Sequence, residues 1–136
     1  MYFGLENRRL QRRLRRFEWS DVEIGVKHLV KEVKGRSEID IILAFSAPGA
    51  IVANFFVAQR PELIPIYGGI TLRRSDHRLM PLQVDHHVLS TSKWKIAIPE
   101  SFLRQKDRRV LVIDDAVVTG DAMSNVLNLL VERGFT

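Results

Sequence analysis

The sequence predicts an α/β fold, in which a parallel β-sheet is flanked by helices. Uninterrupted runs of β-branched and aliphatic residues, such as Val110 to Ile113, are typical of strands that are covered on both faces of a sheet. Apolar residues at three- and four-residue spacing, typical of amphipathic helices, lie between these runs. Because strands and helices alternate along the chain, we expect the strands to run parallel to one another.

The apolar runs and helical patterns define the elements. Four runs are expected to form strands: residues 39–45, 63–72, 94–99 and 110–114. The first helix is expected to start at an S-x-x-E capping box, Ser20 and Glu23, and to end at Gly35. A second should run from residue 51 to Pro61, and a third over residues 123–131. The core-facing residues of the first and third helices are expected to be Val22, Val26, Leu29, Val30 and Val33, and Met123, Val126, Leu127, Leu130 and Val131.

The segments between these elements carry turn-forming or polar residues. Residues 46–50 (SAPGA) are expected to form a turn, and residues 73–92 a long loop or an irregular hairpin. In the second strand, Gly68 and Gly69 indicate a bulge or a close backbone approach rather than a binding element.

The composition fits one globular domain that follows a short basic segment. We place a basic arm or helix at residues 1–19 and the domain at residues 20–136. The chain has no cysteine, which excludes disulfides, thiolate metal sites and cysteine catalysis. No apolar run reaches about 18 residues, and the basic N-terminus lacks an apolar signal core. We therefore expect a cytoplasmic protein without a membrane contact.

The chain has a net charge of +5, and most of the excess of basic over acidic residues lies in the arm. An apolar stripe of Leu5 or Leu10, Leu14 and Phe17 is surrounded by arginines, in a spacing that suits an amphipathic helix. These arginines are Arg8, Arg9, Arg12, Arg13, Arg15 and Arg16. We favour a solvated helix face or a subunit contact, because the arm has no nucleic-acid motif and no aromatic residues between its arginines. Nucleic-acid binding stays open as the alternative.

Two carboxylates follow the last strand, in the stretch RRVLVIDDAVVTGDAM. Asp114 and Asp115 end the apolar run, and Val117 to Gly120 lead into the last helix. In open parallel sheets, ligands bind beyond the carboxyl ends of the strands, where helix N-termini present free N–H groups. The order strand, acidic loop, helix therefore predicts a ligand with hydroxyl groups and a phosphate, together with Mg²⁺. The plainer alternative is an acid pair that caps the helix or is merely solvated.

The stretch VLVIDDAVVTGDA at residues 110–122 resembles the phosphoribosyl diphosphate (PRPP) signature of type I phosphoribosyltransferases. Upstream, FEWSDV, IDIILAFSAPGAIVAN and IPIYGGITL follow the layout of the xanthine–guanine-type members. The resemblance covers about residues 17–134 and implies a Rossmann-like sheet flanked by helices. The family continues with at least one more strand and a base-covering segment after the position of Gly134, so we expect either a C-terminally truncated domain or a protein that lacks that part. We also expect a homodimer.

The resemblance implies a role for each part of this stretch. Asp114 and Asp115 would hold the ribose hydroxyls, as carboxylates accept hydrogen bonds from both groups of a diol. Val118, Thr119, Gly120, Asp121 and Ala122 would wrap the 5′-phosphate with backbone N–H groups. Ser46, Ala47, Pro48 and Gly49 would form the diphosphate loop. The implied reaction is displacement of Mg²⁺-bound diphosphate at ribose C1 by a nitrogen of a nucleobase.

Three positions depart from the family pattern. The diphosphate loop lacks the usual arginine, and Pro48 removes an N–H group that could bind phosphate. Val118 stands where enzymes for 6-oxopurines carry an aspartate, and it cannot exchange a proton with the base. Ala122 replaces the second threonine of the phosphate loop. For residues 46–50 a plain strand-to-helix turn therefore competes with the ligand-loop interpretation.

The polar loop offers further candidates. In the family this region closes over the site, which makes Arg74, Asp76, His77 and Arg78 candidates for closing contacts. A metal cluster of His77, His86 and His87 with nearby aspartates is disfavoured, because adjacent histidines point apart on a strand. The leading hypothesis is a phosphoribosyltransferase that uses PRPP and a nucleobase. The alternatives are a non-catalytic domain that senses PRPP or a nucleoside monophosphate, and a nucleic-acid or partner-binding module that works through the arginine arm.

Overall fold

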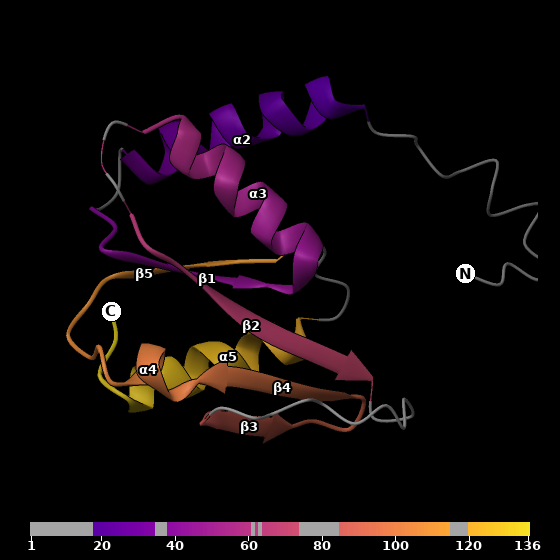
Figure 1. Ribbon diagram of the computed structural model, residues 1–136, viewed down its shortest axis with the longest axis vertical. Helices are drawn as coiled ribbons and strands as arrows, with labels where there is room; N and C mark the ends of the chain where they lie inside the picture. Colours follow the sequence, from indigo (N-terminus) through magenta and orange to yellow (C-terminus); the bar gives the residue numbers. More distant parts are fainter. Residues whose placement is uncertain (1–17, 35–37, 61, 63, 74–84, 115–119) are drawn as a thin grey trace, which may run out of the picture.

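A five-stranded sheet with helices on both faces forms the body of the molecule, so the predicted α/β class is confirmed (Figure 1). The structure is a computed structural model, and it describes residues 18–34, 38–60, 62, 64–73, 85–114 and 120–136. The strand order in the sheet is β3-β4-β2-β1-β5. The predicted basic arm lies, except for its last two residues, outside the described residues, as does Gly35.

Three strands form the parallel part of the sheet. β1 (Ile41–Phe45) pairs in parallel with β2 (Ile66–Arg73) on one side and with β5 (Val110–Ile113) on the other. All five residues of β1 are buried. An uninterrupted apolar run is stable here because helices cover both faces of the sheet and a neighbouring strand lies at each edge.

The other two strands are antiparallel, which corrects the expectation of an all-parallel sheet. β4 (Trp94–Pro99) runs antiparallel to both β2 and β3 (His86–Ser90). A tight turn joins β3 to β4: the Thr91 N–H group donates to the Trp94 carbonyl at 2.8 Å, and the Trp94 N–H group donates to Thr91 Oγ1 at 3.0 Å. β3 is thus a strand within the segment that the sequence predicted to be a loop or an irregular hairpin, and its hairpin partner is β4, outside that segment.

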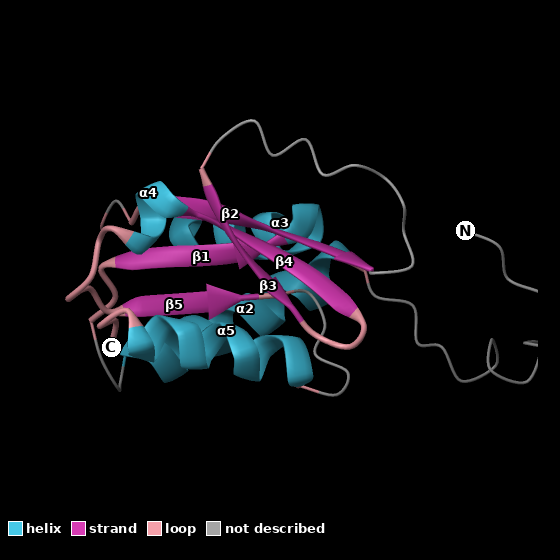
Figure 2. Cartoon of the chain, turned by 90° about the horizontal axis from the view of Figure 1, so that it is seen from below, coloured by secondary structure: helices cyan, strands magenta, loops and turns pink. Residues whose placement is uncertain are grey.

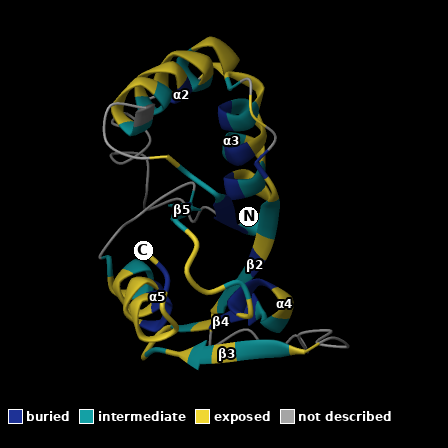
Figure 3. Ribbon diagram, turned by 90° about the vertical axis from the view of Figure 1, so that its left-hand side faces the viewer, coloured by how far each residue is buried: buried dark blue, intermediate teal, exposed yellow. Residues whose placement is uncertain are grey.

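The helices divide between the two faces of the sheet. α2 (Trp19–Lys34) and α3 (Ser46–Ala58) lie on one face, and the short α4 (Glu100–Leu103) and α5 (Asp121–Glu132) lie on the other (Figure 1). Strand twist turns β3 and β4 toward the face that carries α4 and α5 (Figure 3). Within the described part of the chain, no helix is long and apolar enough to cross a membrane.

Each face has its own hydrophobic core, and β1 contributes to both. Ile42 and Ala44 point into the core under α2 and α3, whereas Leu43 and Phe45 point into the core above α4 and α5. This division follows from the alternation of side chains along a strand. The second core also holds Phe135, whose ring stacks on that of Phe102 with centroids 5.0 Å apart.

Two details of the helices correct the sequence-based expectations. α2 begins at Trp19, and its N-terminal hydrogen bond runs from the Glu18 N–H group to Asp21 Oδ2 at 2.9 Å, so the predicted capping box is two residues out of position. On α5, Val126 and Leu130 are buried as expected, but Leu127 and Val131 are exposed. Leu129 and Phe135 complete the buried set instead. The core-facing side of α2 was predicted correctly, because Val26 is buried and Val22, Leu29, Val30 and Val33 pack around it.

Candidate functional site

The carboxyl ends of β1 and β5 lie side by side, and the chain leaves them toward opposite faces of the sheet. α3 follows β1 onto the face shared with α2, whereas α5 follows β5 onto the other face (Figure 1). In Figure 2, β1 and β5 run in the same direction and end at the same side of the molecule. Adjacent parallel strands whose connections leave in opposite directions form a topological switch point, where open α/β sheets bind their ligands.

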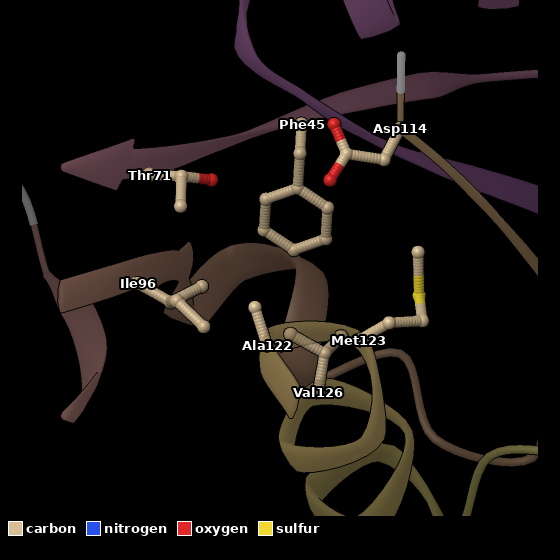
Figure 4. A pocket seen from close by; sticks show the side chains of 7 residues that line it. All are labelled: Phe45, Thr71, Ile96, Asp114, Ala122, Met123 and Val126. Atoms are coloured by element: carbon tan, nitrogen blue, oxygen red, sulfur yellow. The ribbon is translucent and has the colours of Figure 1, made fainter. Parts of the chain in front are cut away.

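Asp114 lies at this switch point, directly after the last residue of β5. Its carboxylate borders a small hollow of about 10 Å³ that is otherwise lined by Thr71 and apolar side chains (Figure 4). These apolar residues are Phe45, Ile96, Ala122, Met123 and Val126. A hollow of this size holds about one water molecule. The described residues therefore form the floor of a site, while Asp115, Val118 and Thr119 lie outside the described residues.

The Phe45 ring lies below Asp114 (Figure 4), and Gly69 leaves room for it. Phe45 and Gly69 are paired in the regular register of β1 and β2, so the alternative of a bulge is wrong. A Cβ atom on Gly69 would lie 2.3 Å from Phe45 Cε1, far inside van der Waals contact. The expected close backbone approach is not found either: the group that comes close is the Phe45 side chain, and it approaches Gly69 but not Gly68.

Residues 46–49 form the first turn of α3, which corrects the predicted turn at residues 46–50. Helix α3 starts at Ser46, whose φ of 62° turns the chain sharply out of β1. Pro48 is compatible with this position, because the first N–H groups of a helix have no partner within the helix. The proline and the glycine that indicated a loop therefore belong to a helix start.

This helix start packs directly against the end of β5. A Cβ atom on Gly49 would lie 3.2 Å from the carbonyl oxygen of Ile113 and 3.6 Å from the Cα atom of Asp114. The fold thus brings together two segments, Ser46 to Gly49 and Asp114, that the sequence had assigned to one ligand site. Sequence reasoning missed Phe45 and Thr71, although each lies near the carboxyl end of a predicted strand.

Two helix N-termini point toward the same edge of the sheet. Neither Phe45, which caps α3, nor Gly120, which caps α5, forms a side-chain capping hydrogen bond. Gly120 adopts the left-handed conformation with a φ of 78°, which costs glycine little. The first-turn N–H groups of Ala47, Asp121 and Ala122 belong to these helix starts, and such groups attract anions.

The opposite ends of β1 and β5 are joined by an ion-pair network. Arg109 Nε donates to Asp40 Oδ2 at 3.2 Å, the Arg109 backbone N–H group donates to the same oxygen at 2.8 Å, and Arg109 NH2 lies 3.0 Å from Glu38 Oε2. These hydrogen bonds lower the pKa of Asp40 and raise that of Arg109. This network was not predicted from the sequence, although Asp40 directly precedes β1 and Arg109 directly precedes β5.

The four predicted residues of the polar loop stay candidates for closing contacts. Arg74, Asp76, His77 and Arg78 lie outside the described residues. His87 on β3 contacts α4 and α5: its Nδ1 atom lies 3.9 Å from Glu100 Oε1 and 3.3 Å from Arg133 NH2. No group of three potential metal-ligating side chains occurs among the described residues.

Solved structures of phosphoribosyltransferases share this fold. No family model matches the chain, and no curated protein matches its sequence. A purine phosphoribosyltransferase from Pyrococcus horikoshii superimposes with a TM-score of 0.62 at 20% identity, over 87% of this chain and 68% of that one. An adenine phosphoribosyltransferase from Trypanosoma brucei, in complex with AMP, pyrophosphate and ribose-5-phosphate, gives 0.60 at 18% identity, over 88% of this chain and 49% of that one.

A hypothetical protein from Neisseria gonorrhoeae with bound ppGpp gives a TM-score of 0.63 at 17% identity, over 88% of this chain and 64% of that one. The chain thus spans about half to two thirds of the length of these three proteins. The class defined by the architecture is therefore the phosphoribosyltransferase fold, as the signature at residues 110–122 suggested.

Proposed function

We propose that the chain binds a 5-phosphoribosyl group at the carboxyl ends of β1 and β5 and transfers it from PRPP to a nucleobase. The observation that carries this proposal is the position of Asp114, at a switch point between two helix N-termini. Neighbours of the same fold bind AMP, ribose-5-phosphate and ppGpp, which are ligands that all carry a phosphorylated ribose.

The chemistry of the proposed site divides between the acids and the helix starts. Asp114 and Asp115 would accept hydrogen bonds from the two ribose hydroxyls. The segment Val118 to Ala122 would surround the 5′-phosphate, because the N-terminus of α5 offers backbone N–H groups and a favourable dipole. Asp121 in the first turn of α5 adds a negative charge close to this position.

The carboxylates of Asp114 and Asp115 are suitable ligands for a magnesium ion that binds together with PRPP. Carboxylate oxygens are ligands that Mg²⁺ prefers, and the ion keeps waters and substrate phosphates in its coordination shell. Asp114, with Asp115, would hold such an ion beside the diphosphate of PRPP. When bound, Mg²⁺ neutralises charge on the departing diphosphate. The positioning of the ribose is the task of the protein side chains.

The absence of an acid at Val118 disfavours some bases as substrates. Val118 offers no proton exchange to a 6-oxopurine, and a general acid or base contributes about 10²–10⁴-fold to a rate. We therefore expect slow or no transfer to hypoxanthine, guanine or xanthine. The proposed enzyme could therefore share the sequence layout of the xanthine–guanine-type members without using their bases. The purine and adenine phosphoribosyltransferases among its neighbours make adenine a base to test.

A specific observation favours a second candidate, a regulatory domain that binds a nucleotide without turning it over. Ser46 to Gly49 are wound into α3 and pack against β5, so they present a helix start and not an extended loop to the diphosphate. Pro48 also removes one N–H donor from that turn. Such a site suits a ligand with a ribose 5′-phosphate better than one that also carries a 1-diphosphate.

Two measurements separate these candidates. A ligand that binds only the folded state raises the melting temperature. At 100 times its Kd, it raises the free energy of unfolding by about 2.7 kcal/mol. Both candidates predict a shift with AMP or GMP. The transferase requires a shift with PRPP and Mg²⁺ as well, which a regulatory domain that senses PRPP would also give, so turnover decides between them. Diphosphate release with adenine, hypoxanthine, guanine and xanthine then tests turnover, for which about 1–10³ per second is ordinary. No shift with any of these ligands would contradict both candidates.

A further inference from the structure

The two helices on one face of the sheet leave an apolar groove between them. This α2–α3 groove has a volume of about 510 Å³. It is lined by residues from α2 and from the start of α3: Trp19, Asp21, Val22, Gly25, Val26, Leu29, Pro48, Ile51 and Val52. Asp21 is the charged residue among them. A groove of this volume and character falls in the range of surfaces that bind apolar groups.

Large apolar side chains at the groove are exposed to solvent. Trp19 is 65% exposed, although its ring stacks on Phe55 of α3 with centroids 6.0 Å apart, and Ile51 is 43% exposed. In Figure 3 the outer side of α2 is coloured as exposed over most of its length. A concentration of exposed apolar residues around a groove indicates a surface that another segment covers.

Gly25 points to what covers the groove. It lies in the interior of α2, where glycine is a poorer helix former than any residue except proline. A Cβ atom at this position would meet nothing within 4 Å among the residues packed around it. Packing within the described part of the chain therefore does not require a glycine here. A glycine that lines a groove does allow the backbone of a second helix to approach closely.

We propose that the arginine-rich segment before α2, residues 5–14, folds back as a helix and covers the α2–α3 groove. This segment carries the apolar stripe of Leu10 and Leu14, and it joins α2 next to Trp19, at the edge of the groove. An antiparallel return with Arg15 to Glu18 as the connection would bring Leu14 and Leu10 alongside the first two turns of α2. Connections of this length are usual between antiparallel helices.

Charge and length agree with this occupant. Asp21, whose carboxylate also accepts a hydrogen bond from the Glu18 N–H group, lines the groove, and the segment carries arginines on both flanks of its apolar stripe. From Leu10 to Leu14 a helix advances about 6 Å, which lies within the span of about 10 Å that α2 covers from Val22 to Leu29. Because the segment is tethered beside the groove, its effective concentration there is high.

Trp19 provides a direct readout, because the chain has two tryptophans and replacing Trp94 with phenylalanine isolates its signal. In the full-length Trp94→Phe chain, a docked segment shields Trp19 from acrylamide. Leu10→Ser with Leu14→Ser should shift the Trp19 emission to the red and increase its quenching. The matched control, Arg8→Ser with Arg12→Ser on the opposite side of the same helix, should leave both unchanged. Equal quenching in the two variants would overturn the proposal.

Gly25 gives a second, independent test through the sign of a stability change. With the segment docked, Gly25→Leu fills the space that the segment needs and should lower the melting temperature. In the Leu10→Ser, Leu14→Ser background the same change should raise it, because leucine is a better helix former than glycine. If Gly25→Leu prevents folding, Gly25→Ala provides the same comparison with a smaller side chain. A rise in both backgrounds would contradict docking.

A second copy of the chain is the competing occupant. In that case Trp19 would become more protected as the protein concentration rises, and the protection would survive in the Leu10→Ser, Leu14→Ser variant. That outcome would also overturn the proposal. Protection that is independent of concentration and lost in this variant supports it.

Discussion

The two ends of the β1–β5 strand pair use aspartates in different ways. At the amino ends, Asp40 accepts hydrogen bonds from the side chain and the backbone of Arg109, so its charge is matched by a partner within the fold. At the carboxyl ends, Asp114 borders an apolar hollow beside two helix N-termini. Two aspartates at opposite ends of the same strand pair therefore have different roles. Asp40 stabilises the pairing of the strands, and we propose that Asp114 binds a ligand.

Replacing the acids at the carboxyl ends should have the largest effect. Asp114→Asn with Asp115→Asn removes the charge that would accept hydrogen bonds from the ribose, each worth about 1.5–3 kcal/mol. The variant should lose the increase in melting temperature that AMP or PRPP with Mg²⁺ produces, measured by differential scanning fluorimetry. Asp40→Asn, at the other end of the strands, is the control and should keep that increase. An unchanged shift in the double variant would remove these acids from the proposed role.

An intermediate effect is expected at the glycine pair on β2. Gly69→Ala places a methyl group against the Phe45 ring, and overpacking of this kind costs about 1–3 kcal/mol. Gly68→Ala is the matched control, because its Cβ atom meets nothing within 4 Å, and it should change stability by about 0.5 kcal/mol or less. Urea unfolding of the two variants measures the difference. Equal midpoints would show that the Phe45 ring moves aside without cost.

The smallest effect should come from Asp40→Asn, and it should depend on pH. Because the folded-state pKa of Asp40 lies below its ordinary value of 3.8, its ion pair stabilises the fold above that pH. This stability is lost as the pH falls through the folded-state pKa. Asp40 is partly exposed, so we expect the variant to lose about 1 kcal/mol or less at pH 7. Melting temperatures of the two proteins should converge as the pH falls below 3.8 and through the folded-state pKa of Asp40, and a difference that stays constant over this fall in pH would contradict the assignment.

The strands that the sequence predicted best are those buried on both faces. β1 and β5 are continuous apolar runs, and a short run of this kind between turn-forming or charged residues is typical of a strand inside a parallel sheet. β3 was missed because its sequence, HHVLS, is half-exposed and begins with two histidines. The direction of β4 was wrong because local pattern carries no information on whether a strand runs parallel or antiparallel. A hairpin with β3 sets that direction.

The candidate site could be predicted in part from the sequence, and the errors in that prediction have physical causes. Asp114 was identified because an acid pair ends an apolar run. The start of α3 was placed five residues too late, because proline and glycine favour turns and are also tolerated in the first turn of a helix. The ion pair of Asp40 and Arg109 joins residues far apart in the sequence. It could have been found only by recognising that the two apolar runs are neighbours in the sheet.

The position of Phe135 in the core determines the order in which the two faces can pack as the chain emerges from the ribosome. The core under α2 and α3 is complete once Ile113 has been made, whereas the core above α4 and α5 also needs α5 and Phe135. Synthesis proceeds at roughly 5–20 residues per second, so the interval between them lasts about 1–4 s. During that time the apolar side chains of Leu43, Ile96 and Ile98 have no helix α5 to cover them. A nascent chain should therefore be most prone to aggregation, and most attractive to chaperones, in this interval.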